Sequence, residues 1–122
     1  MSSKKLHSVQ HKLKLLRILK KLKPSEREEI ISKLSEEGIN DLSETVFNCL
    51  YCDMSMDKKA RKKLRKQLFH FENDLRFIAN KDKPWQSRRK KLVTQSGGAI
   101  GAILATVVPI IASIIADRLK AK

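Results

Sequence analysis

The sequence is poor in the residues on which several common classes of protein depend. Its two cysteines, Cys49 and Cys52, are too few for the disulfide framework of a small secreted scaffold. No apolar segment follows the N-terminus, so we expect a reducing compartment and no secretion through a signal peptide. The alternation of apolar and polar residues that marks a β-strand is missing before residue 97. These absences favour a helical protein.

Residues that carry enzymatic chemistry also lack a recognisable arrangement. The pair Gly97-Gly98 belongs to no phosphate-binding loop, because neither a strand–helix unit nor a Lys-Ser/Thr pair surrounds it. No Ser-His-Asp set can be assigned, and the glutamates between residues 28 and 37 resemble surface charges of helices. We predict a protein that is not an enzyme and has no catalytic residue and no cofactor.

The two cysteines stand three residues apart, so on a helix they would share one face. Zinc would need two further ligands. His7 and His11 could supply them if the first helix lay over the third. We favour the alternative, in which both cysteines pack as small apolar residues, and we predict no metal site.

What the chain has in excess is positive charge. Lys and Arg number 27 against 13 Asp and Glu, which gives a formal net charge of +14. Residues 1–23 hold eight bases and no acid, residues 24–57 nine acids and two bases, and residues 58–93 fourteen bases and three acids. Residues 92–116 carry no charge. Such a balance favours nucleic acid, an anionic membrane surface or an acidic protein as partner.

Apolar residues at steps of three and four predict helices over most of the chain. The expected helices cover residues 4–22, 25–37, 41–52, 57–80 and 84–93. Ser25 and Glu28 have the spacing of a capping box, Gly38 fits the end of the second helix, and Asn40 or Asp41 can cap the third. We therefore predict an all-α fold, a small helical bundle of four to five helices followed by an apolar C-terminal helix hinged at Pro109.

The same pattern suggests four consecutive parts. They are a basic amphipathic helix (1–23), a small helical core (24–80), a basic linker or helix (81–96) and an apolar membrane-active tail (97–122). A core of 57 residues is marginal by itself. The first helix is accordingly expected to dock on this core or on a partner.

The tail has the length and the composition of a membrane segment. Residues 97–116 are uncharged, and twenty helical residues match the hydrocarbon core of a bilayer. A glycine-rich start, a central proline and a basic end are typical of peptides that lie in an interface and then insert. A plain membrane anchor and a helix buried in a hairpin remain alternatives. The residues expected to insert are Ile100, Ile103, Leu104, Val107, Val108, Pro109, Ile110, Ile111, Ile114 and Ile115.

Part of the tail is similar to a lytic peptide. The order "IGAIL", Pro109, "IIASII" and then basic residues resembles melittin-like peptides over about 24 residues. The alignment needs a small length difference before the proline, and Asp117 departs from the pattern. The resemblance implies that the segment inserts in bilayers and disrupts them.

The pair Gly97-Gly98 has two readings. It is a helix breaker, because glycine has the greatest backbone freedom, or it is a processing site. "TQSGG" resembles the Gln-Thr-Gly-Gly end of SUMO proteins and the Gly-Gly sites of adenovirus-type cysteine proteases, which imply a cut after Gly98. The adenoviral pattern wants Met, Ile or Leu where this chain has Gln95. The residues of this hypothetical cleavage site are Gln95, Ser96, Gly97, Gly98 and Ala99.

Two basic stretches are candidates for binding anions. They comprise Lys58, Lys59, Arg61, Lys62, Lys63, Arg65 and Lys66, and then Arg88, Arg89, Lys90 and Lys91. Nucleic acid would be bound through its phosphates, with steep salt dependence and no sequence readout. Anionic lipid and a merely solvated face are the alternatives. Trp85 could stack on a base or sit at a headgroup boundary, although a packing role is more common for a lone tryptophan.

The order of these parts resembles that in a family of proteins encoded by mobile elements. "KKARKKLRKQL" (58–68) and "KKLVTQSGG" (90–98), followed by an apolar Gly/Pro tail, are similar to small basic proteins of Polinton (Maverick) elements and adintoviruses, over residues 13–116. The resemblance implies a minor virion component that binds capsid protein or DNA and is cut by an adenovirus-type protease.

These features together predict a virion-type or mobile-element protein with a basic helical body and a membrane-active C-terminal segment. The alternatives are a DNA-binding or DNA-condensing core protein and a single-span membrane-anchored adaptor. Oligomerisation through the tail would be compatible with each. We expect the protein in the virion or inside the host cell, at a membrane or in the nucleus.

Overall fold

The computed structural model describes residues 3–51 and 58–120, which are helical nearly throughout and contain no strand. The elements are α1 (Ser3–Lys21), α2 (Pro24–Ser32), α3 (Glu36–Tyr51), α4 (Lys58–Leu68), the 3₁₀ turn η1 (Phe69–Phe71), α5 (Glu72–Ala79), α6 (Trp85–Thr94) and α7 (Ala99–Lys120). The predicted all-α helical bundle is confirmed.

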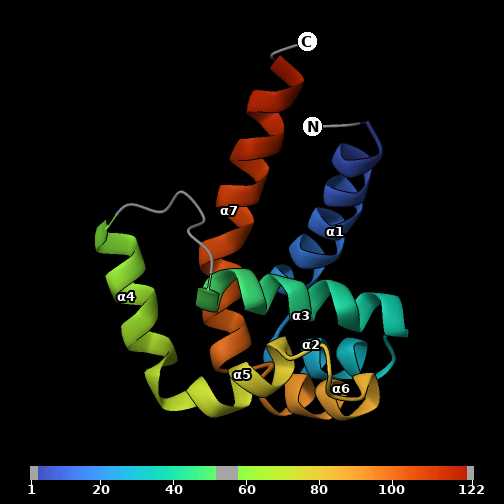
Figure 1. Ribbon diagram of the computed structural model, residues 1–122, viewed down its shortest axis with the longest axis vertical. Helices are drawn as coiled ribbons and strands as arrows, with labels where there is room; N and C mark the ends of the chain where they lie inside the picture. The colour runs from blue at the N-terminus through green and yellow to red at the C-terminus, as the bar shows by residue number, and fades with distance from the viewer. Residues whose placement is uncertain (1–2, 52–57, 121–122) are drawn as a thin grey trace.

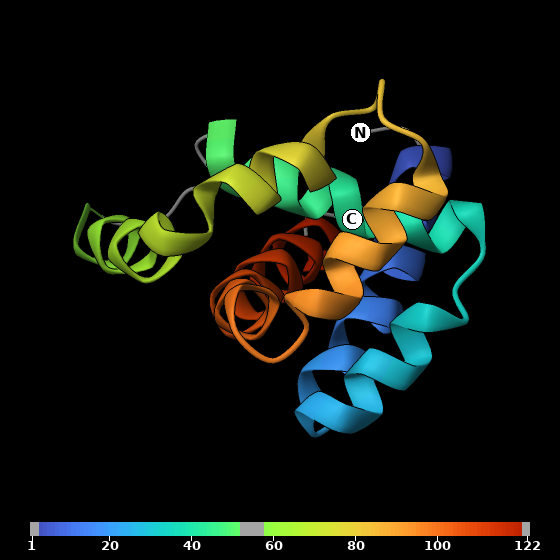
Figure 2. The same ribbon diagram turned by 90° about the horizontal axis from the view of Figure 1, so that it is seen from below.

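α7 is the central helix of this bundle. It runs beside α1 in Figure 1, and Figure 2 shows it between α1 on one side and α4 on the other; α3 packs on it as well. α2 packs on α6, and α3 packs on both α5 and α6. The helices α2, α5 and α6 form the lower end of the molecule in Figure 1. α4 extends to one side and touches the rest of the bundle mainly through α7 and η1.

The buried apolar residues that the structure describes are all aliphatic. α7 contributes Ala99, Ile100, Ile103, Leu104, Val107 and Val108, each at most 5% exposed. Every other α-helix adds at least one buried aliphatic residue, including Leu16 of α1, Val46 of α3 and Ile78 of α5. We expected the segment from residue 97 onward to be an appendage of a core closed by residues 24–80. Instead its first half fills the centre of the bundle, because those residues are the most apolar of the chain and the other helices turn their buried aliphatic side chains toward them.

The predicted helix over residues 57–80 is broken into two parts. α4 ends at Leu68, η1 follows, and α5 begins at Glu72. A straight helix of this length would extend about 36 Å and would leave the bundle. The break lets Leu64 and Leu68 lie against α7 while Leu75 and Ile78 join α3 and α6.

Three local predictions about helix ends were wrong. α2 begins at Pro24, one residue before the proposed cap, and the N–H of Lys23 donates to Glu26 Oε1 at 3.1 Å, so Glu28 is not the capping partner. α3 already begins at Glu36, because Ser35 Oγ accepts from the N–H of Gly38 at 3.4 Å. Gly38 therefore lies inside α3 and does not end the preceding helix.

The expected hinge at Pro109 is not confirmed. α7 continues as a helix from Ala99 to Lys120 with Pro109 inside it. A proline removes the hydrogen bond to the carbonyl four residues earlier, here that of Ala105. Both Ala105 and Pro109 are exposed, so this carbonyl can be hydrated from outside the bundle.

Candidate nucleic-acid interface and the Gly-Gly turn

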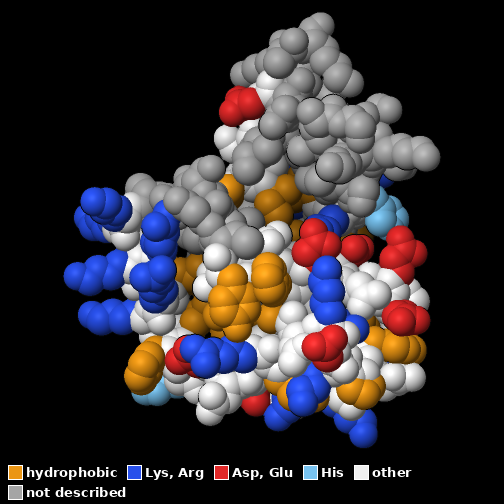
Figure 3. Space-filling view, viewed as in Figure 1, with side chains coloured by type: hydrophobic (Ala, Val, Ile, Leu, Met, Phe, Trp, Pro, Cys, Tyr) orange, Lys and Arg blue, Asp and Glu red, His pale blue; other side chains and the backbone are white. Residues whose placement is uncertain are grey.

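α4 presents the strongest concentration of positive charge in the structure. Seven of its eleven residues are Lys or Arg, interleaved with Leu, Ala and Gln, all of which favour helix. Ala60, Leu64 and Leu68 form a narrow apolar stripe at steps of four that packs against the core. The cations occupy the remaining circumference of the helix. Figure 3 shows them as a fringe of Lys and Arg at the left edge of the molecule.

Most of these cations have no acidic partner among the side chains that the structure describes. Lys58, Lys59, Lys62, Lys63, Arg65 and Lys66 are exposed. Ion pairs between side chains described by the structure join Lys12 with Glu44, Lys33 with Glu29, Arg76 with Glu72 and Lys91 with Asp74, and none involves those six residues. The charge of α4 is therefore available to an external anion.

The second predicted basic stretch is mostly engaged within the protein. Arg88 is buried, and its guanidinium donates to Ser43 Oγ at 2.8 Å, Asn40 Oδ1 at 2.9 Å and the carbonyl of Lys83 at 3.1 Å. It connects α6 to α3 and is not accessible to an anion. The prediction of Arg88 as an anion-binding residue is corrected accordingly, since a run of four cations does not show which of them faces inward.

The neighbours of Arg88 are only partly available. Lys91 Nζ lies 3.1 Å from Asp74 Oδ1, and Arg89 lies over the ring of Trp85 at 5.0 Å. Lys90 is exposed. Hydrogen bonds from Lys91 and Gln95 lower the pKa of Asp74 below its usual value. Trp85 is partly buried under Arg89 and has the packing role that we considered more common.

The Gly-Gly turn joins α6 to α7 in a compact, hydrogen-bonded form. The carbonyl of Gln95 accepts from the N–H of Gly98 at 3.3 Å and from that of Ile100 at 3.0 Å. Gln95 Nε2 donates to Asp74 Oδ2 at 2.8 Å, and Ser96 and Ala99 are buried beside the exposed glycines. A Cβ at Gly97 would approach Pro24 Cβ to 3.3 Å, so close packing against α2 favours glycine there.

Arg27 holds this turn, and the sequence analysis did not identify it. Its guanidinium donates to the carbonyls of Leu19 at 2.9 Å, Leu22 at 3.1 Å and Ser96 at 2.5 Å. The side chain is buried and pairs with no carboxylate of the described residues, and burial lowers the pKa of Arg27. The only signal in the sequence is that Arg27 is one of two bases in the acidic segment 24–57.

The residues predicted to enter a membrane divide into three groups. Ile100, Ile103, Leu104, Val107 and Val108 are buried in the core, Ile110 and Ile111 are half-buried, and Pro109 is exposed. The side chains of Ile114 and Ile115 lie outside the described residues. Among the described helices, none alone has the length and apolar character to cross a membrane. Residues 85–94 and 99–113 meet that criterion only as a pair bent by 96°.

The cysteine and histidine residues form no described metal site. Cys49 is mostly buried, and burial raises the pKa of its thiol to about 12. Cys52 and the side chain of His7 lie outside the described part of the chain. Within that part, no group of three or more potential metal-ligating side chains comes together.

The chain matches no protein-family model, no curated protein and no solved structure.

Proposed function

We propose that this protein binds the phosphate backbone of nucleic acid through α4, without reading its sequence. The observation that carries the proposal is the set of six exposed cations on α4 that have no acidic partner among the described residues. Each phosphate that a cation neutralises releases condensed counterions, which makes such binding favourable and dependent on salt. The resemblance to Polinton and adintovirus proteins would place this activity in a virion or a mobile-element particle.

The dimensions of α4 suit a duplex backbone. Eleven helical residues extend about 16 Å, and B-DNA carries about one phosphate per 1.7 Å of axis, so roughly nine phosphates fall within its reach. Only those on the side that faces the protein can be contacted, roughly four or five. The six exposed cations on the helix are enough to meet them in more than one orientation, which is consistent with binding that ignores sequence.

The test is the salt dependence of binding to a random-sequence duplex. We expect the full chain to bind with a steep slope of log K against log salt. The triple variant Lys62→Gln, Lys63→Gln, Lys66→Gln should flatten this slope by about 2.7, because each lost phosphate contact removes about 0.9. Its affinity at physiological salt should fall at least about tenfold.

A matched control separates a local interface from net charge. Lys14→Gln, Lys20→Gln, Lys21→Gln removes the same number of exposed charges from α1. If the proposal is correct, the α1 variant keeps most of the affinity and slope. Equal losses in the two variants would mean that only the total charge matters, and no measurable binding by the full chain would reject the proposal.

A second candidate function is membrane insertion by α7. It is favoured by the uncharged run from Leu92 to Ala116, whose length would suffice for a bilayer. Because five of the proposed membrane residues are buried in the core, this activity requires α7 to leave the bundle. A cut after Gly98 by an adenovirus-type protease would remove the covalent link that holds α7 beside α6.

Dye release from anionic vesicles tests this candidate. The peptide 99–122 should cause leakage, whereas the full chain should cause little until the bundle is destabilised. Loss of the hydrogen bonds of Arg27 in Arg27→Met should increase leakage relative to Arg17→Met, which removes an exposed charge from α1. If the peptide releases no dye, α7 is a core helix and has no lytic activity.

A further inference from the structure

Three aromatic residues of this protein are exposed, although two others, Phe71 and Trp85, pack against the core. The chain has four Phe, one Tyr and one Trp, and none of them is among the buried residues. Phe47 is 40%, Tyr51 56% and Phe69 70% exposed. Aromatic side chains bury more apolar area than any others, so a small bundle gains by placing them inside. The exposure of Phe47, Tyr51 and Phe69 therefore favours an external partner.

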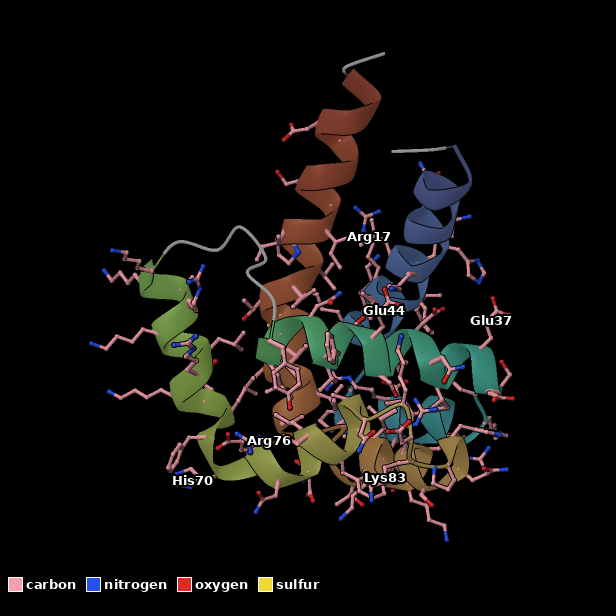
Figure 4. The ribbon with its side chains drawn as sticks, in the orientation of Figure 1. Arg17, Glu37, Glu44, His70, Arg76 and Lys83 are labelled. Atoms are coloured by element: carbon pink, nitrogen blue, oxygen red, sulfur yellow. The ribbon has the colours of Figure 1, made fainter. Side chains whose placement is uncertain are left out.

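Two of these rings line a hollow between α3 and α5. Phe47 and Tyr51 stand one turn apart on α3, with ring centroids 5.0 Å apart and a tilt of 55°. The hollow has a volume of about 760 Å³ and is also lined by Asn48, Asn80 and Arg76. Figure 4 labels Arg76 on α5, below α3, and Glu44 on α3, which lies at the edge of the hollow.

The third ring lies in a second hollow that reaches α4. This hollow, of about 290 Å³, is lined by Phe69, by Leu50 of α3 and by Arg61 and Arg65 of α4. Glu72 lines it as well, and its carboxylate pairs with Arg76 of the first hollow at 2.5 Å. The aromatic face is thus continuous with the basic helix. Figure 3 shows the apolar patch near the centre of the face, with the cations of α4 along its left side.

The charges around the first hollow are mixed rather than uniformly positive. Glu44 pairs with Lys12 at 2.8 Å, Arg76 pairs with Glu72, and Lys81 and Asp82 complete the rim. A phosphate would gain little here, whereas a neutral base can stack on a ring and exchange hydrogen bonds with the amides of Asn48 and Asn80. Phosphates would be held by α4, at the other end of the same face.

We infer that this face binds single-stranded nucleic acid, with bases stacked on Phe47, Tyr51 and Phe69 and the backbone directed along α4. A base in a duplex keeps its faces stacked on its neighbours, so only a single strand can offer them to protein rings. The inference rests on the proposed function, since α4 supplies most of the affinity. It adds the class of nucleic acid and the side chains that distinguish it.

The experiment compares two fluorescent probes with the full chain at one salt concentration, a 20-nucleotide oligo-dT strand and a 20-base-pair duplex. We expect Phe47→Ala, Tyr51→Ala to lose about ten- to a hundredfold in affinity for the strand and less than about threefold for the duplex. The double variant Ile18→Ala, Ile30→Ala removes other exposed apolar residues and should change neither value. Circular dichroism would verify that both variants remain folded.

The outcomes separate this inference from the proposed function. Suppose that the α4 variant weakens duplex binding while the Phe47→Ala, Tyr51→Ala variant leaves the affinity for the single strand unchanged. That result would overturn the inference and leave the proposed function standing. Failure of the α4 variant to weaken either probe would overturn the proposed function. Sedimentation of the protein without nucleic acid tests another occupant, a second copy of the chain. Self-association that the aromatic variant abolishes, with strand binding unchanged, would also overturn the inference.

Discussion

Arg27 offers the most direct test of how this bundle is held together. We consider Arg27→Met, which keeps an apolar stem of similar length and removes the guanidinium. The carbonyls of Leu19, Leu22 and Ser96 would lose the donors that lie 2.5 to 3.1 Å away. Leu19 lies in the last turn of α1 and Leu22 directly follows the helix, at the end where the helix dipole also favours a cation.

The expected loss is about 3 kcal/mol in the free energy of unfolding. A hydrogen bond from a charged donor contributes about 1.5 to 3 kcal/mol, and buried acceptors left without a partner add to the loss. The full sum of three such bonds is not expected, because the variant no longer has to desolvate the guanidinium. For a chain of this size, the melting temperature should fall by about 12 °C.

The assay is thermal and urea unfolding followed by circular dichroism, with Arg17→Met as the control. Arg17 is exposed on α1, so its substitution changes the net charge equally without removing a buried contact. Arg27→Lys should fall between the two, because one ammonium cannot reach three separated carbonyls with the geometry of a guanidinium. Surface substitutions usually change the free energy of unfolding by no more than about 0.5 kcal/mol. If the free energies of unfolding of Arg27→Met and Arg17→Met differ by less than this, the hydrogen bonds of Arg27 do not stabilise the bundle as argued.

Other parts of the structure give further expectations. Arg88→Met should destabilise the protein by about 2 kcal/mol, because it leaves Ser43 and Asn40 without their buried donor, while Lys90→Met should have little effect in the same unfolding assay. The thiol pKa of Cys49 is about 12, so few of these thiols are ionised at pH 8. In a Cys52→Ser background, Cys49 should therefore react with a thiol reagent roughly a thousandfold more slowly than an unperturbed cysteine. In denaturant it should react at the ordinary rate. Comparable rates in the two conditions would contradict its burial. The lowered pKa of Asp74 contributes stability above about pH 4, the ordinary pKa of the unfolded carboxyl, and this stability is lost as the pH falls through the folded value. Asp74→Asn should therefore lose less stability between pH 5 and pH 2 than the wild type, and equal acid sensitivity would contradict the assignment.

The fold class could be predicted from the sequence because helical periodicity is a local property. The spacing of Leu64, Leu68, Leu75 and Ile78 identified the buried face of residues 57–80 correctly, even though η1 interrupts the helix. The break itself was not predictable, since it depends on α7 lying on one side and α3 on the other. Helix ends were missed as well: local spacing favoured Ser25 for α2 and Asn40 or Asp41 for α3, whereas α2 begins at Pro24 and α3 begins directly after Ser35.

The exposure of the cations in the candidate site could be predicted from the sequence only where a helix carries too many of them to bury. α4 carries so many cations on one short helix that most must be exposed, whatever the tertiary structure. In α6 the same residue types gave a wrong expectation for Arg88, because its burial depends on Ser43 and Asn40, 45 and 48 positions away. Arg27 was missed for the same reason, as its contact with Ser96 spans 69 positions.

α7 is both a core helix of the bundle and a candidate membrane segment, and its role in the core limits what a cut after Gly98 could achieve. Burial of Ile100, Ile103, Leu104, Val107 and Val108 stabilises the bundle by roughly 8 to 15 kcal/mol, at about 1.5 to 3 kcal/mol for each side chain. This gross contribution, from which the conformational entropy of folding is not subtracted, is as large as the net stability of a typical small domain, about 5 to 15 kcal/mol. Cleavage removes one covalent link and leaves these contacts in place, so a nicked protein should remain assembled. α7 can reach a bilayer only when the bundle opens as a whole, and the membrane must then bury the apolar surface that the core gives up.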